Sequence, residues 1–134
     1  MTGLTRAMMG LAGLLGALAV AMGAYAAHGL DAKYGGQAAD RAALGAQYQA
    51  IHALCLFIVA FAACHMRRRK TMLLAGALFA LGAMLFPGAL YALAMGGPPE
   101  FAALAPVGGG ALILGWLTLA WAGIEGQDYD HRAR

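Results

Sequence analysis

Apolar residues occur along this chain in four long runs, separated by short polar stretches. The runs contain no Asp, Glu, Lys or Arg and extend over residues 7–27, 48–66, 72–95 and 106–124. At 1.5 Å per residue, helices of about 19 to 24 residues reach roughly 28 to 36 Å, close to the thickness of a hydrocarbon core near 30 Å. The pattern therefore predicts an all-α membrane protein, a four-transmembrane-helix bundle in one domain over residues 1–134.

The connections between the runs set the expected helix ends. The stretch 29–39 holds Asp31, Lys33 and the Gly35-Gly36 pair, so we expect a loop there. A second helix is expected to begin near Asp40 as its N-cap and to continue into the apolar run. The helices are thus predicted at about 7–27, 40–66, 72–95 and 106–124, with Pro87 kinking the third because proline removes a helical hydrogen bond.

Composition supports membrane insertion: 62% of residues are hydrophobic and 11% are charged. A soluble chain of this length would leave large apolar patches in water. The N-terminus has one competing interpretation as a cleaved signal peptide, because Arg6 precedes an apolar stretch that ends near Ala24-Tyr25-Ala26. We expect a retained helix, since an apolar run of about 20 residues is longer than a signal core of about 7–15.

Basic residues predict the orientation in the membrane. Four of the nine lie together between the second and third runs, as Arg67, Arg68, Arg69 and Lys70. Lys and Arg concentrate in cytoplasmic loops, so this segment is the expected topology anchor. Alternate threading then leaves Lys33 and Arg41 as the two outside and puts both termini in the cytoplasm. The net charge of +3 is explained by this anchor and by the lipid bilayer, and no nucleic-acid partner is expected.

Polar side chains inside the runs gather toward the expected outer half of the membrane, and they form the candidate polar site: His28, Tyr48, Gln49, His52 and Tyr91. His52 lies 15 residues before Arg67, roughly 20 Å from the cytoplasmic boundary by helical rise. An ionisable side chain at this depth is a functional hypothesis, with His28 and Tyr91 as the expected partners. The alternative is a neutral His52 that hydrogen-bonds between helices and only stabilises the bundle.

Small residues also follow helical spacing in the first run. Gly13, Ala17 and Ala21 share one stripe, and Ala19, Gly23 and Ala27 share another. Such stripes let helices approach closely in lipid, and packing within the bundle is the simpler interpretation. The two cysteines, Cys55 and Cys64, are nine residues apart on one helix and are expected to be apolar packing residues on opposite faces.

Four ordered motifs resemble the YgdD-like family of small four-helix inner-membrane proteins, known as domain-of-unknown-function family 423. They are residues 23–30 (GAYAAHGL), Tyr48-Gln49 with residues 52–54 (HAL), residues 85–91 (LFPGALY), and Pro106 with Gly108-Gly109 and Gly115-Trp116. The resemblance spans almost the whole chain and implies a multi-pass protein of the bacterial inner (plasma) membrane, without an established activity. Family members usually carry hydroxyl residues where this chain has Pro87, Ala89 and Ala105.

Three function classes remain open. The first is a non-catalytic bundle that forms a homo-oligomer or docks on a larger membrane complex. The second is a small oligomeric carrier or channel that uses the candidate polar site, although no carboxylate lies inside any run. The third is haem binding by His28 and His52, or metal binding by His52 and Cys55, where ligands are too few for a usual site.

We favour the first class and predict no cofactor, no metal and no catalytic residue. The chain has no serine, and its carboxylates fall only in connections and the tail, so a nucleophile, a base and an orienting group cannot be assembled. The sequence leaves the ligand, the partner and the oligomeric number unspecified.

Overall fold

The protein is all-helical, with four long apolar helices of a length and composition able to cross a membrane. The computed structural model describes residues 1–65 and 69–132, and of residues 125–132 it describes only the backbone. The long helices are α1 (Gly3–Tyr25), α3 (Gly36–His65), α4 (Arg69–Ala94) and α5 (Leu104–Arg132). The short elements are the π-helix η1 (Ala26–Leu30), α2 (Asp31–Tyr34) and the 3-10 helix η2 (Pro99–Ala103).

The first connection is helical where the sequence predicts a loop. Helix α1 continues through η1 and α2 to Tyr34, and the π-helical step widens one turn so that the ring of Tyr25 lies on Gly29. The reversal then takes one residue, Gly35, whose φ of 85° suits glycine. The carbonyl of Gly35 accepts from the amides of Ala38 and Ala39, so α3 begins at Gly36 and Asp40 is not its N-cap.

The other ends also differ from the expected bounds. Helix α5 begins at Leu104, which puts Pro106 in its first turn, and it continues beyond residue 124 to Arg132. Helix α4 begins at Arg69 and remains α-helical through the buried Pro87 to Ala94. Of the expected topology anchor, Arg67 and Arg68 lie outside the described residues, and Arg69 and Lys70 open α4.

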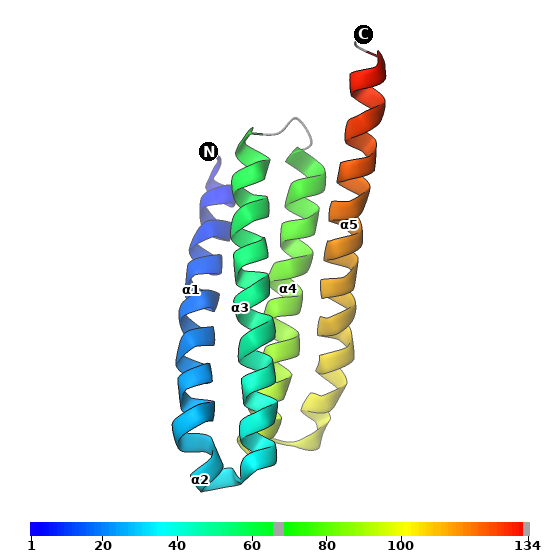
Figure 1. The fold of residues 1–134 in the computed structure, drawn as a ribbon. Helices are drawn as coiled ribbons and strands as arrows, with labels where there is room; N and C mark the ends of the chain where they lie inside the picture. The colour runs from blue at the N-terminus through cyan, green and yellow to red at the C-terminus, as the bar shows by residue number, and fades with distance from the viewer. Residues whose placement is uncertain (66–68, 133–134) are drawn as a thin grey trace.

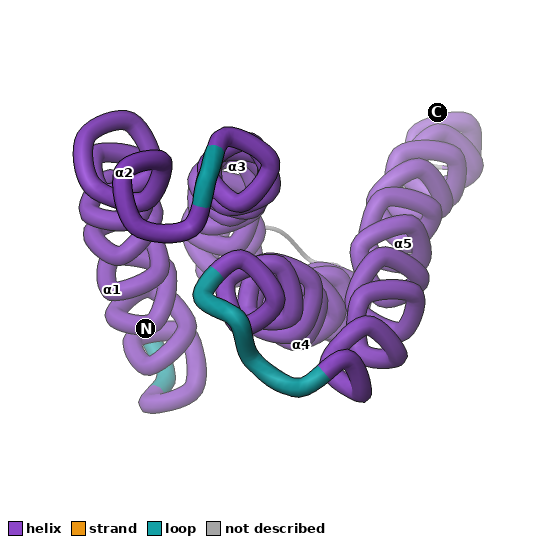
Figure 2. The backbone as a smooth tube through the Cα atoms, turned by 90° about the horizontal axis from the view of Figure 1, so that it is seen from below, coloured by secondary structure: helices purple, strands orange, loops and turns teal. Residues whose placement is uncertain are grey.

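The long helices pack in chain order. Helix α3 lies against α1 and α4, and α5 lies along α4, so α1 and α5 stand at opposite ends of a bent row (Figure 2). The N-terminus, the start of α4 and the end of α5 lie at one end of the bundle, and α2 and η2 lie at the other (Figure 1). At the first of these ends, Arg69 Nη2 donates to Thr2 Oγ1 at 2.5 Å. We call it the Arg69 end, and the other the Gly35 end.

Glycines set the closest approaches in the row. A Cβ at Gly108 of α5 would overlap the backbone of Phe86 in α4, and one at Gly115 would lie 2.7 Å from the ring of Phe79. Between α3 and α4, the ring of Tyr91 fills the space over Gly45. The main core forms where α1, α3, α4 and α5 contribute Met8, Leu15, Leu56, Phe79 and Leu112. These contacts fix the polar side chains described next.

Candidate functional site

His52 lies in the interior of α3 and is 5% exposed. Its Nδ1 lies 2.7 Å from the carbonyl oxygen of Tyr48, one helical turn earlier, and Trp116 Nε1 on α5 lies 3.2 Å from its Nε2. An indole N–H can only donate, so Nε2 must be the acceptor and Nδ1 must carry the proton. The geometry thus assigns a neutral imidazole, and a proton added at Nε2 would face the Trp116 N–H.

Aromatic rings surround this imidazole. The ring of Tyr48 stacks on that of His52 at 6.0 Å between centroids, and Phe79 of α4 lies at 5.7 Å. Trp116 presents an edge to both His52 and Phe79, at interplanar angles of 73° and 70°. Edge-to-face contacts are a favoured arrangement of aromatic pairs. The imidazole therefore joins three helices, although the backbones of α3 and α5 are not neighbours in the row.

Gln49 also joins α3 to another long helix by a hydrogen bond. Its side chain is 1% exposed, and its Nε2 donates to the carbonyl oxygen of Leu15 in α1 at 2.9 Å. Consecutive turns of α3 thus send one amide toward α1 and one imidazole toward α5. Hydrogen bonds of this type between helices are a usual source of cohesion in lipid.

Tyr91 is buried between α4 and α3, apart from His52. Its ring lies over Gly45 and packs in a cluster of small apolar residues that includes Ala26, Leu30 and Ala42. Its hydroxyl has no hydrogen-bond partner among the described residues. A buried, unsatisfied hydroxyl costs about 1–3 kcal/mol, so this group either lowers stability or meets a molecule that the protein holds there.

His28 lies exposed in η1, far along the bundle from His52. Ala46 of α3 faces Gly23 of α1, with its Cβ 3.7 Å from the position of a Cβ at Gly23. His28 lies five residues from this level toward the Gly35 end, and His52 lies six residues from it toward the Arg69 end. At 1.5 Å per residue the two histidines are separated by roughly 16 Å along the bundle axis.

This separation corrects the expected pairing of the histidines. A single metal ion bound at about 2.0–2.1 Å by two imidazoles requires their nitrogens to lie about 4 Å apart. Within residues 1–65 and 69–132, with side chains to 124, no three His, Cys, Asp or Glu residues are grouped to hold a metal ion. Cys55 is half-buried, while the outward nitrogen of His52 is occupied by Trp116. His28 and His52 therefore cannot bind one haem iron or metal ion together.

Of the five candidate residues, the structure brings together Tyr48 and His52. Gln49 turns to α1, Tyr91 to Gly45, and His28 to the surface. Sequence reasoning missed Trp116, the interhelical partner of His52. The available signal was chemical: a buried neutral imidazole needs a donor, and Trp116 is one of three side-chain donors between residues 104 and 124, with Thr118 and Trp121.

Small residues on α1 divide between two faces. Ala19 is buried, and Gly23 faces Ala46 of α3, so this stripe serves packing within the bundle. The opposite face is exposed and carries a row of small residues, and a Cβ at the glycines of this row would meet no atom within 4 Å. We call this face the α1 outer stripe; its residues are Gly10, Gly13, Ala17, Ala21 and Ala24.

A groove of about 270 Å³ borders the α1 outer stripe where α1 meets α3. Its lining is wholly apolar and is formed by Ala12, Gly13, Gly16, Ala50, Ala53, Leu54 and Phe57. Large exposed side chains also lie beside the small ones on α1: Leu14 is 72% exposed and Val20 is 74% exposed. This face thus combines a hollow with projecting apolar side chains.

Comparison with known proteins places the chain among membrane proteins without an established function. Residues 22–109 match a family described as "Protein of unknown function (DUF423)". The chain is 37% identical over 108 residues to the UPF0382 membrane protein YwdK of Bacillus subtilis, covering 81% of this chain and 88% of the relative. No solved structure matches.

Two further relatives come from Gram-negative bacteria. A UPF0382 membrane protein of Haemophilus influenzae is 33% identical over 117 residues, which cover 87% of this chain and 93% of the relative. The UPF0382 inner membrane protein YgdD of Escherichia coli is 35% identical over 117 residues, which cover 86% and 87%. Their names locate this group of relatives in the membrane and describe no reaction.

Proposed function

Since the chain belongs to the DUF423 (UPF0382) family of membrane proteins of unknown function, no activity comes from its relatives, and we propose one from the structure. It is a multi-pass inner-membrane protein, and we infer that it acts as a non-catalytic bundle that assembles with a second copy of itself. The observation that carries this proposal is the α1 outer stripe, an exposed row of small residues that makes no contact within the bundle.

The absence of catalysis is supported by how the polar atoms of the spans are used. His52 and Gln49 are buried in the described core, and both form hydrogen bonds between helices. A carrier or channel through the candidate polar site would need these groups to face one path. Instead Gln49 bonds to α1 and His52 is bonded by α5, and Tyr91 and His28 lie elsewhere.

Self-association through α1 is supported by its exposed glycines, which lower the stability of the helix. A glycine within a helix is roughly 0.5–1 kcal/mol less favourable than alanine, and small residues in lipid are a common means of close helix contact. In α4 and α5 several glycines are explained by contacts inside the bundle, whereas Gly10 and Gly13 have no such contact. Close approach by a helix outside this chain would explain them.

A second copy of this chain is the occupant that we propose. A two-fold pair of identical faces is the commonest arrangement of homo-oligomers, and it places each hollow opposite the same surface. The apolar groove beside Gly13 is then available to projecting residues such as Val20. Spacing of small residues by four, as in Gly13, Ala17 and Ala21, is typical of helix pairs in membranes.

We further propose that both termini face the cytoplasm. Of the Lys and Arg residues that the structure describes, four lie toward the Arg69 end, namely Arg6, Arg69, Lys70 and Arg132, and Lys33 and Arg41 lie near the Gly35 end. This asymmetry supports the orientation through the preference of basic residues for the cytoplasmic side. Cysteine labelling of intact cells at Tyr34→Cys, in a variant without Cys55 and Cys64, tests it. A reagent that cannot cross the membrane should label this position.

The assembly is tested by native mass spectrometry and by energy transfer between labelled copies in lipid nanodiscs and vesicles. Gly13→Leu obstructs the α1 outer stripe, and Gly88→Leu is the matched control, an exposed glycine on α4 that likewise has open space over it. We expect wild type and Gly88→Leu to pair and Gly13→Leu to associate about tenfold more weakly. A monomeric wild type, or equal association of all three, would overturn the proposal.

A further inference from the structure

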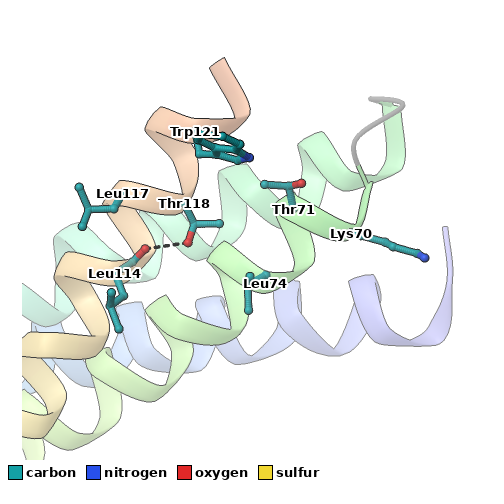
Figure 3. A pocket seen from close by; sticks show the side chains of 7 residues that line it. All are labelled: Lys70, Thr71, Leu74, Leu114, Leu117, Thr118 and Trp121. Atoms are coloured by element: carbon teal, nitrogen blue, oxygen red, sulfur yellow. Dashed lines mark hydrogen bonds between the residues drawn. The ribbon is translucent and has the colours of Figure 1, made fainter. Parts of the chain in front are cut away.

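A second groove lies between α4 and α5 at the Arg69 end, with a volume of about 460 Å³. Seven side chains line it, and Figure 3 shows all of them: Lys70, Thr71, Leu74, Leu114, Leu117, Thr118 and Trp121. Because α4 begins at Arg69 and α5 runs antiparallel to it, the polar residues lie at the mouth and the leucines lie deeper. The groove is therefore graded from polar to apolar along the membrane normal.

Two side-chain donors lie near the mouth. Thr71 Oγ1 and Trp121 Nε1 have no hydrogen-bond partner among the described residues, and the indole nitrogen of Trp121 lies on the side that faces Thr71 (Figure 3). Thr118 differs, since its hydroxyl donates to the carbonyl oxygen of Leu114 at 2.7 Å. Trp121 Nε1 thus lies at the mouth, where tryptophan suits the headgroup level of a bilayer, and the Thr71 hydroxyl, which is turned away from Trp121 in Figure 3, reaches the mouth after a rotation of its side chain.

Positive charge accompanies these donors. Lys70 lines the groove and is exposed, with its ammonium group turned away from Trp121 in Figure 3 at the end of a flexible side chain. Thr71 lies in the first turn of α4, where unpaired amide groups give a helix its positive end. Arg69 is already bonded to Thr2, which leaves Lys70 as the described cation closest to the mouth.

We propose that this groove binds an anionic phospholipid. The phosphate lies at the mouth, where it accepts a hydrogen bond from Trp121 Nε1, and it accepts one from Thr71 Oγ1 and pairs with Lys70 after rotations of these two side chains. One acyl chain follows Leu74, Leu114 and Leu117 toward the middle of the bilayer. Basic clefts between transmembrane helices are a recurrent kind of site for acidic lipid headgroups, and the gradient of polarity here matches the lipid's own.

The occupant is a lipid because the apolar part of the groove opens on the surface that faces the bilayer. Leu74, Leu114 and Leu117 are 55%, 54% and 60% exposed, so the bundle leaves them for another apolar molecule. A soluble anion would satisfy the mouth but would leave this surface uncovered. The inference does not depend on self-association, because α1 and α5 stand at opposite ends of the row.

The test uses the intact chain in nanodiscs that hold equal amounts of phosphatidylglycerol and phosphatidylcholine with the same acyl chains. Native mass spectrometry then counts which lipids stay bound after release. Lys70→Gln removes the cation at the mouth, and Lys33→Gln removes an exposed cation near the Gly35 end as the control. We expect the preference of wild type for phosphatidylglycerol to fall about fivefold in Lys70→Gln and to persist in Lys33→Gln.

A second pair of variants separates this groove from a diffuse attraction of the whole basic end. Thr118→Phe fills the groove without a change of charge, and Ile113→Phe adds the same ring at an exposed site of α5 outside it. We expect Thr118→Phe to lose bound phosphatidylglycerol while Ile113→Phe keeps it. Equal retention of the two lipids by wild type, an equal effect of both lysine variants, or an unchanged Thr118→Phe would overturn the proposal.

Discussion

Trp116→Phe should weaken the bundle through one hydrogen bond. The substitution keeps an aromatic edge against His52 and Phe79 but removes the N–H that His52 Nε2 accepts. Hydrogen bonds between membrane helices average about 0.6 kcal/mol and reach about 1.7. The bond here spans 3.2 Å, and the indole is 48% exposed, which favours the lower part of this range. Because phenylalanine also has a smaller ring than tryptophan, we expect a total loss of about 1 kcal/mol in the free energy of unfolding.

The hydrogen bond is isolated by a double-mutant cycle that combines Trp116→Phe with His52→Leu. Once His52 has gone, the loss of the indole N–H costs nothing further, so the coupling between the two changes should be about 0.6 kcal/mol. Reversible unfolding in bicelles, followed by far-UV circular dichroism, gives the four free energies. Trp121→Phe is the control, since Trp121 is 58% exposed and makes no hydrogen bond with a described residue. Additive effects of the first two substitutions would refute the assigned tautomer and its bond.

Three further predictions use the same unfolding measurement. Gly108→Ala should cost more than about 2 kcal/mol, because the added Cβ meets the backbone of Phe86. Gly110→Ala, where the added Cβ meets open space, should change stability by under about 1 kcal/mol. Equal effects would contradict the close packing of α4 and α5. Tyr91→Phe should raise stability by about 1 kcal/mol by removing an unpaired hydroxyl, and a loss would instead reveal a molecule bound to it. Gln49→Leu should cost under about 1 kcal/mol, since the carbonyl that it bonds keeps its helical partner, and a loss above about 2 kcal/mol would show a larger role.

Hydropathy predicts most of this fold because lipid imposes a simple condition: a long run without charge must be helical and must span. The four runs accordingly correspond to α1, α3, α4 and α5, and three of them extend past the helix end by one or two residues. The first connection was mispredicted for a local reason. Asp31, Lys33 and the glycine pair suggest a loop, yet a π-helical turn and the single positive φ of Gly35 keep this stretch helical and make the reversal abrupt.

The candidate site was harder to predict because helical spacing gives the face of a residue and not its neighbour. Tyr48 and His52 share one helix, so their proximity follows from spacing alone. The partners of Gln49 and His52 depend on how α1 and α5 are arranged around α3, and 34 and 64 residues separate them in sequence. His28 and Tyr91 are the partners that depth in the membrane predicts for His52. The register between α1 and α3 instead separates His28 from His52 along the bundle axis.

The chain-order packing of the helices has a consequence for biogenesis. Each long helix after α1 packs against the long helix that precedes it in the sequence, so every segment leaving the ribosome meets a partner that is already in the membrane. The stabilising contacts are therefore mostly between consecutive segments, and α5 is the last to dock. The hydrogen bond from Trp116 to His52 joins α5 to α3 rather than to α4. It can form only after the final helix has been synthesised, so its presence indicates a completely assembled bundle.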